Sequence, residues 1–158
     1  MDREQFISLV EAVQQPLRRF LTALCCGDRQ LADDIAQESL IKAYLSSDGL
    51  ADPARFKAWL YRIAYNTFVN SRRAVRLTVG YREAADIVSV ETTDAAFRYE
   101  ALYKALGRLH DRERTSVLLF YLEGYSVKEI SAISETTESA VKQHLSRGRR
   151  HLRELLTT

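Results

Sequence analysis

Aromatic, amide and guanidinium side chains alternate along one segment, WLYRIAYNTFVNSRR at residues 59–73. Helical spacing predicts an apolar face that packs in a core, formed by Trp59, Leu60, Ile63, Ala64 and Phe68. The remaining face carries Tyr61, Arg62, Tyr65, Asn66, Val69, Asn70, Arg72 and Arg73. Rings stack on unpaired bases, amides contact base edges and guanidinium groups neutralise phosphates, so this face is suited to single-stranded DNA. The same pattern also fits a core helix with a solvated edge.

A second candidate for DNA contact is SVKEISAISETTESAVKQHLSRGRRHLREL at residues 126–155. Ser126 and Glu129 form a capping box that starts a short helix, and the polar turn SETT separates it from a helix beginning near Thr137. That helix is expected to bury Val141, Leu145, Gly148 and Leu152. Its other side carries Ser139, Lys142, Gln143, Ser146, Arg147, Arg149 and Arg150. The pattern predicts a helix-turn-helix whose second helix enters the major groove, although a helical hairpin with solvated charges remains an alternative.

The segment ADDIAQESLIKAYL at residues 32–45 carries a third candidate surface. An apolar arc is expected to face a core, and a second stripe of Asp34, Glu38, Ile41 and Leu45 recurs at helical spacing on another side. A mixed acidic and aliphatic stripe suits docking onto a partner helix, but many ordinary surface helices look the same.

The elements that must position these residues are all predicted to be helices. One runs from Phe6 to Leu24 and is bent or interrupted near Pro16, and Gly27 and Asp28 separate it from a second that reaches about Ser46. The third runs from about 53 to 76, and the helical period lapses between 74 and 97. We therefore expect an all-α protein with two small helical domains, 1–76 and 98–158, joined by a flexible linker at 77–97.

Composition excludes several classes of protein. The 158 residues include only 6 Gly and 2 Pro, which argues against a loop-rich β fold or a glycine-rich phosphate-binding fold. No apolar run approaches the roughly 20 residues that span a bilayer, and the charged start MDREQF is unlike a signal peptide. We expect a cytoplasmic protein without membrane insertion. The net charge is only +2, so the basic residues of the last helix form a local positively charged surface on a near-neutral protein.

The sequence does not predict an enzyme. Asp33, Asp34 and Glu38 could be mistaken for a metal-binding carboxylate cluster, but no His lies nearby, and no nucleophile motif is present. We expect no catalytic residue, metal or cofactor. The adjacent Cys25 and Cys26 are interpreted as small buried thiols, with a redox sensor as the alternative.

Three segments in this order resemble the extracytoplasmic-function (ECF) group of bacterial RNA polymerase sigma factors. DDIAQESLIKAY (33–44) is similar to region 2.2, which grips the clamp helices of the polymerase β′ subunit. FKAWLYRIAYNTFVNSRR (56–73) is similar to regions 2.3 to 2.4, which melt and read the −10 element. The segment at 109–152 is similar to region 4, which reads the −35 element. The resemblance implies an alternative sigma factor, and a stand-alone helix-turn-helix regulator is the other hypothesis.

The resemblance also implies partners and site residues. The partners are core RNA polymerase (β′ clamp helices and β subunit), promoter DNA that is duplex at −35 and single-stranded at −10, and an anti-sigma factor. Polymerase contacts are expected from Asp33, Asp34, Gln37, Glu38 and Ile41. Contacts to −10 DNA are expected from Tyr61, Arg62, Tyr65, Asn66, Asn70 and Arg73. Contacts to −35 DNA are expected from Ser139, Lys142, Gln143, Ser146, Arg147, Arg149 and Arg150.

The chain departs from the usual region 4 pattern at a few positions. Many relatives have Gly where this chain has Ser139, and a Ser-Arg pair where it has Gln143 and His144. His110 stands where Pro is common. These changes leave the expected fold intact but alter the groups offered to the −35 element. Because the chain ends right after the recognition helix, we expect no regulatory C-terminal extension.

Overall fold

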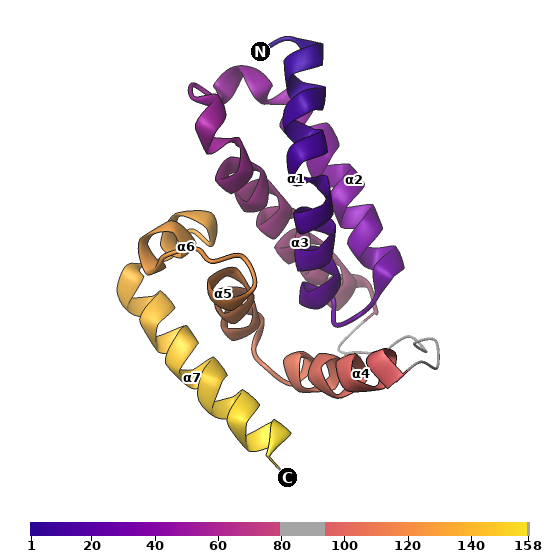
Figure 1. Cartoon of the computed structure of the whole chain (residues 1–158), viewed down its shortest axis with the longest axis vertical. Helices are drawn as coiled ribbons and strands as arrows, with labels where there is room; N and C mark the ends of the chain where they lie inside the picture. Colours follow the sequence, from indigo (N-terminus) through magenta and orange to yellow (C-terminus); the bar gives the residue numbers. More distant parts are fainter. Residues whose placement is uncertain (80–93, 158) are drawn as a thin grey trace.

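The computed structural model describes residues 1–79 and 94–157, with side chains except at 75–79 and 94–98, and these residues form helices and connecting turns without a strand. The N-terminal lobe contains α1 (Arg3–Leu24), α2 (Arg29–Leu45), two short 3-10 helices at Ser47–Gly49 and Pro53–Arg55, and α3 (Phe56–Val79). The C-terminal lobe contains α4 (Asp94–Gly107), α5 (Asp111–Tyr121), α6 (Val127–Ile133) and α7 (Glu138–Leu156). The two lobes lie side by side (Figure 1). The all-α, two-lobe prediction is confirmed.

The N-terminal lobe packs its three long helices around a common core. Asp2 and Asp28 accept hydrogen bonds from the backbone N–H groups of Gln5 and Leu31, so each caps the start of a helix as an N-cap aspartate does. Helix α1 continues through Pro16, so of the two expected effects of this proline the interruption is excluded. The core of this lobe includes Leu17, Phe20, Leu21, Leu24, Ile35, Ala36, Leu60 and Phe68.

The turn between α1 and α2 requires a glycine. Gly27 has φ +92, in the left-handed region, and its N–H donates to the carbonyl of Thr22 at 2.8 Å. A Cβ at this position would lie 3.0 Å from the Tyr103 ring of α4. Gly27 therefore lies in the turn that follows α1 and permits the close approach of the second lobe.

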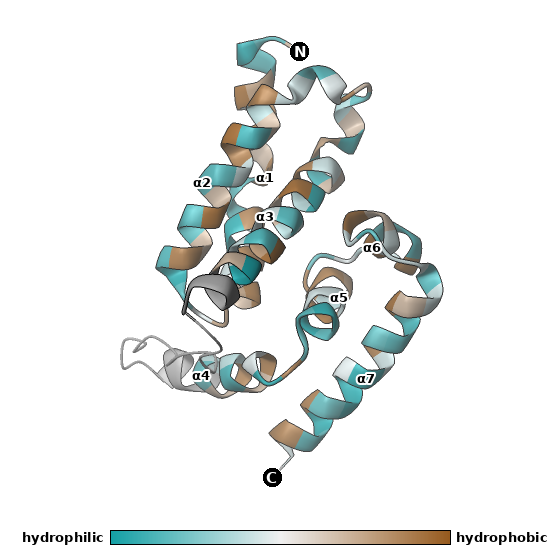
Figure 2. Ribbon diagram, turned by 180° about the vertical axis from the view of Figure 1, so that it is seen from behind, coloured by the Kyte–Doolittle hydropathy of each residue, from teal (hydrophilic) through white to brown (hydrophobic). Residues whose placement is uncertain are grey.

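The C-terminal lobe has the predicted helix-turn-helix. The Ser126 side chain accepts from the N–H of Glu129, whose carboxylate accepts from the N–H of Ser126, so the capping box is confirmed. Thr137 caps α7 through the N–H of Ala140. Val141, Leu145 and Gly148 are buried, and Leu152 is half-buried. Figure 2 shows that most of α7 is hydrophilic, with hydrophobic positions recurring along it. This narrow apolar stripe fixes which side of α7 faces outward.

The predicted linker is helical at both ends. Helix α3 continues to Val79 and α4 begins at Asp94, so residues 77–79 and 94–97 belong to helices. Residues 80–93, which hold the rest of the predicted linker, lie outside the described residues. Helix α1 contacts α4 and α5, and α3 contacts α6, so the lobes touch along two of the N-terminal helices. No helix in the described part of the chain is long and apolar enough to cross a membrane.

Candidate nucleic-acid and polymerase interfaces

The outer face of α7 presents every residue that the sequence assigned to it. Because the buried stripe turns toward α5 and α6, the opposite side meets solvent. All of its predicted contact residues are exposed, namely Ser139, Lys142, Gln143, Ser146, Arg147, Arg149 and Arg150. Arg149 donates to the Tyr121 hydroxyl at 3.0 Å, which holds its guanidinium at the flank of the helix. The face has hydrogen-bonding groups near its N-terminal end and cations further along, the arrangement that reads base edges between phosphates.

Two tyrosines of α3 do not lie where the sequence predicted. Tyr61 is 0% exposed and Tyr65 4% exposed, so the expectation that both face solvent is wrong in this structure. Tyr61 stacks on Phe20 of its own lobe at 5.2 Å between ring centroids and meets Tyr125 of the other lobe edge-on at 5.9 Å. Burial raises the pKa of both phenols above the usual value. Conversely, Trp59 is only half-buried.

The other predicted −10 residues share one stripe of α3. Arg62, Asn66, Asn70 and Arg73 follow one another at intervals of four or three residues, which places them along one side of the helix. We call these four residues the α3 polar stripe. Asn70 and Arg73 are exposed, while the exposed Arg62 and the half-buried Asn66 donate hydrogen bonds to the other lobe. Part of the predicted DNA surface is therefore open and part is already occupied.

The occupying group is Glu135, in the turn between α6 and α7. Its Oε1 accepts from Arg62 Nε at 2.8 Å and from Asn66 Nδ2 at 3.2 Å. These hydrogen bonds lower the pKa of the Glu135 carboxyl below its usual value, so it is ionised at neutral pH. Glu135 was not among the predicted site residues, because nothing in the local sequence links this turn to α3.

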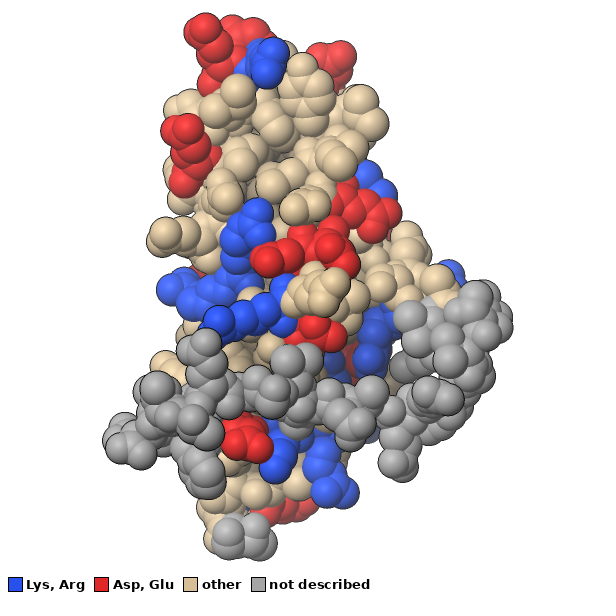
Figure 3. Space-filling model, turned by 90° about the vertical axis from the view of Figure 1, so that its right-hand side faces the viewer, with Lys and Arg blue, Asp and Glu red and all other residues tan. Residues whose placement is uncertain are grey.

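The exposed side of α2 combines acidic groups with apolar side chains. Asp33, Asp34, Gln37, Glu38 and Ile41 are all exposed, as predicted, and Leu45 is 78% exposed. Asp33 pairs with Arg18 at 2.7 Å, and Glu38 with Lys42 at 3.4 Å. Figure 3 shows the side of the molecule on which α2 lies, with broad uncharged areas between scattered charges. Large exposed aliphatic side chains beside carboxylates are suited to a protein partner.

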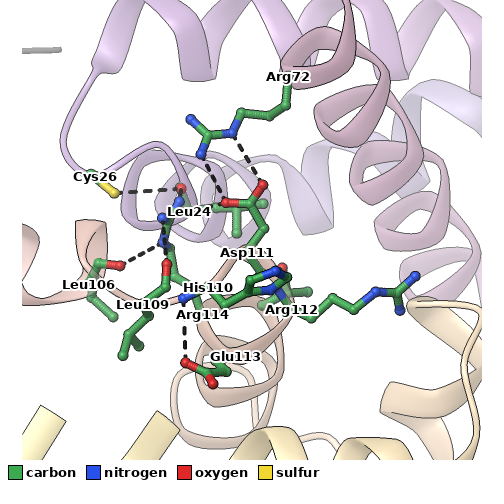
Figure 4. A network of polar contacts seen from close by, with 11 residues as sticks. Leu24, Cys26, Arg72, Leu106, Leu109, His110, Asp111, Arg112, Glu113 and Arg114 are labelled. Carbon is green, nitrogen blue, oxygen red and sulfur yellow. Dashed lines mark hydrogen bonds and ion pairs between the residues drawn. The ribbon is translucent and has the colours of Figure 1, made fainter. Parts of the chain in front are cut away.

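A polar network joins the lobes at the N-terminal end of α5 (Figure 4). Asp111 accepts from Arg72 Nη2 at 2.9 Å and from its Nε at 3.3 Å, a bidentate pair between α3 and α5. Next to it, the fully buried Arg114 donates to the carbonyls of Leu106 and Leu24 at 2.8 Å each. Sequence reasoning missed this network, because a polar DRER segment reads as solvated surface.

The two cysteines lie beside this network. Both are free and half-buried. Burial, followed by the neighbouring Cys26, raises the pKa of Cys25 to about 12, so its thiol is protonated at neutral pH. A protonated thiol is a poor nucleophile, which favours the structural interpretation of this residue. Among the described residues, no group of three or more His, Cys, Asp or Glu side chains has the arrangement of a metal site.

Comparison with known proteins matches both lobes. A family model described as Sigma-70 region 2 matches residues 9–78, and one described as Sigma-70, region 4 matches residues 99–152. The ECF RNA polymerase sigma factor SigL of Mycobacterium tuberculosis is 30% identical, covering 80% of this chain and 75% of SigL. The ECF RNA polymerase sigma factor SigW of Bacillus subtilis is 29% identical, covering 98% and 90%. The chain belongs to the ECF sigma factors.

A solved structure supports the same conclusion for the whole ECF sigma factor. The sigma factor RpoE from Bartonella quintana, solved in complex with the anti-sigma factor NepR, is 28% identical with a TM-score of 0.83, covering 97% of each chain. An ECF sigma factor directs transcription initiation and is not an enzyme, as expected. The alternative of a stand-alone helix-turn-helix regulator is not favoured.

Proposed function

We propose that this sigma factor acts through three separate surfaces. The exposed side of α2 binds the β′ clamp helices of core RNA polymerase, with a further contact to the β subunit; the α3 polar stripe contacts the −10 element; and the outer face of α7 contacts the −35 element. The observation that carries the proposal is the exposure of one face of α7. Its buried stripe of Val141, Leu145 and Gly148 leaves every predicted −35 residue exposed on the opposite side.

The candidate residues for the −10 element differ in their exposure to solvent. Asn70, Arg73 and Arg62 are exposed as the lobes stand, but Glu135 accepts hydrogen bonds from Arg62 and from the half-buried Asn66. Tyr61 belongs to the core of its lobe through Phe20, and Tyr65 is also covered. We therefore assign the first contacts with unpaired DNA to Asn70 and Arg73 of the α3 polar stripe. Stacking by either tyrosine would require the lobes to separate.

The mechanism needs no covalent chemistry from this chain. Core polymerase fixes the two lobes at the spacing of the promoter elements, so the second DNA contact becomes effectively intramolecular. Non-template bases that leave the stack are then held by the α3 polar stripe, which shifts the melting equilibrium toward open DNA. Strand opening is thus driven by binding free energy.

An anti-sigma factor is the proposed regulator. The similar RpoE chain was solved in complex with NepR, and the α2 side of this chain exposes Ile41 and Leu45 next to carboxylates. A protein that covered this side would block polymerase binding. Both partners of this surface would be met in the cytoplasm, where RNA polymerase works.

Run-off transcription tests the proposal directly. Sheared DNA from the source genome is transcribed by core polymerase with and without the protein, and new discrete transcripts are expected only when it is added. Ile41→Glu should lower their yield at least about tenfold, because it buries a charge in the polymerase contact. Leu156→Glu, at another exposed aliphatic position, is the matched control. No new transcripts, together with tight duplex binding without polymerase, would instead favour a stand-alone regulator.

A further inference from the structure

Carboxylates of the C-terminal lobe pair with cations of α3 along much of its length. Arg62 pairs with Glu135 at 2.8 Å, Lys57 with Glu123 at 3.4 Å and Arg72 with Asp111 at 2.9 Å. The three cations come from one helix, whereas the carboxylates come from the start of α5, the segment after α5 and the turn before α7. From Lys57 to Arg72 the helix rises roughly 22 Å at 1.5 Å per residue, so the contact is extended.

The backbone at Glu135 indicates that its side chain has a role beyond the turn. Glu135 has φ +52, in the left-handed region that suits glycine and is unfavourable for a glutamate. A glycine would form the same turn more easily. The glutamate instead provides a carboxylate that reaches Arg62 and Asn66 of the other lobe. The cross-lobe hydrogen bonds therefore offset a local conformational cost.

The contact around Glu123 shows why the closed arrangement should be reversible. The Glu123 side chain is 1% exposed and lies between Lys57 at 3.4 Å and Arg19 at 4.0 Å. The hydroxyls of Tyr61 and Tyr125 are buried beside this carboxylate, and burial, followed by the charge of Glu123, raises the pKa of both phenols. Separation of the lobes would return these groups to water, which recovers their lost solvation. Closure is thus favoured by ion pairs and opposed by desolvation.

We propose that the C-terminal lobe is an intramolecular inhibitor of −10 binding, in which Glu135 occupies on the α3 polar stripe the groups that DNA would contact. This inference rests on the proposed function of that stripe. The Glu135 carboxylate accepts hydrogen bonds from the same guanidinium and amide groups that a phosphate or a base edge would use. Single-stranded DNA and Glu135 therefore compete for the same donor groups of Arg62 and Asn66.

The test is the binding of fluorescein-labelled oligothymidylate to the full chain, followed by fluorescence anisotropy. Glu135→Gly removes the carboxylate and suits the positive φ, so it should bind about 3- to 10-fold more tightly than the unmodified chain. Glu135→Gln should give a smaller gain, because its amide oxygen still accepts a hydrogen bond. Glu138→Gln is the matched control: it makes the same change in charge three residues away at an exposed position and should stay within about twofold.

Small-angle scattering provides a second readout. The radius of gyration of Glu135→Gly should exceed that of Glu138→Gln at low salt, with equal helical content by circular dichroism. Equal affinities and equal radii for the two variants would overturn the inference and leave the proposed −10 surface standing. If Asn70→Ala with Arg73→Ala fails to weaken oligothymidylate binding, the stripe is not the DNA surface, and that result overturns both the proposed function and this inference.

Discussion

Arg114 of α5 donates a hydrogen bond from Nη1 to the backbone carbonyl of Leu24, the last residue of α1, at 2.8 Å. The same guanidinium donates to the carbonyls of Leu106 in α4 and Leu109 in the segment after it, at 2.8 and 3.2 Å. Carbonyls at helix C-terminal ends lack intrahelical partners, and a cation there is also favoured by the helix dipole. One buried side chain thus donates hydrogen bonds to the carbonyls at the C-terminal ends of two helices in different lobes.

Arg114→Met should be strongly destabilising. The side chain is 2% exposed, so its removal leaves three buried carbonyls without this donor, and we expect a loss of about 3 kcal/mol in the free energy of unfolding. Arg114→Lys should recover only part of it, since one ammonium does not reproduce the planar fork. Urea unfolding followed by circular dichroism measures both variants. The neighbouring Arg112→Met, at an exposed position, is the control, and equal midpoints for Arg112→Met and Arg114→Met would contradict this role.

Gly148→Ala should destabilise the helix-turn-helix although alanine is the better helix former. A Cβ at Gly148 would lie 2.7 Å from Cγ2 of the buried Val117, a short β-branched side chain that cannot move far aside. We expect this overpacking to cost about 1–3 kcal/mol, more than the helix propensity gained. In a double-mutant cycle by urea unfolding, Val117→Ala should reduce the cost of Gly148→Ala. Additive effects would show that the two positions are not in conflict.

Local sequence signals predicted the elements and the α7 face well. The capping box at Ser126 and Glu129 lies within four residues, and the periodic stripe through Val141, Leu145 and Gly148 fixes the outward side of α7. Both depend on neighbours close in sequence, which a pattern records. The sequence left open whether α1 is bent or interrupted at Pro16, and the helix continues because packing along the rest of it outweighs the hydrogen bond that proline removes.

Contacts between the lobes were not predictable from patterns. Tyr61 and Tyr65 have aromatic bodies with polar tips, so a helical wheel assigns them equally well to a core or to a wet face. Helical periodicity predicted a single buried side of α3. In the structure, α3 is covered on one side by its own lobe and on another by the C-terminal lobe. Glu135 is separated from Arg62 by a long stretch of chain, and only the fold brings them to 2.8 Å.

Stability should fall in mild acid through His144. Burial, and next the guanidinium of Arg112, lowers the pKa of this imidazole below 6.5, with opposition from Glu113. The unfolded chain therefore takes up the proton first as the pH falls, so the stabilisation present above pH 6.5 is lost as pH falls through the lower folded-state pKa. His144→Gln should flatten the decline in unfolding free energy between about pH 7.5 and pH 5. Urea unfolding across this range checks it, and identical slopes would contradict it.

Substitutions of two exposed residues of α7 should change the binding of −35 duplex DNA in different ways. Arg150 lies in the basic part of the helix, where a phosphate contact is expected, so Arg150→Ala should weaken all duplexes alike and reduce the salt slope of log K by about 1. Gln143 lies nearer the N-terminal end, where base edges are read, so Gln143→Ala should relax preference at one base pair by about 1–3 kcal/mol with the slope unchanged. Polymerase holoenzyme titrated onto promoter and single-substitution duplexes at several salt concentrations separates the two effects. If Gln143→Ala changed only the salt slope, the groove-facing side of α7 would have to be reassigned.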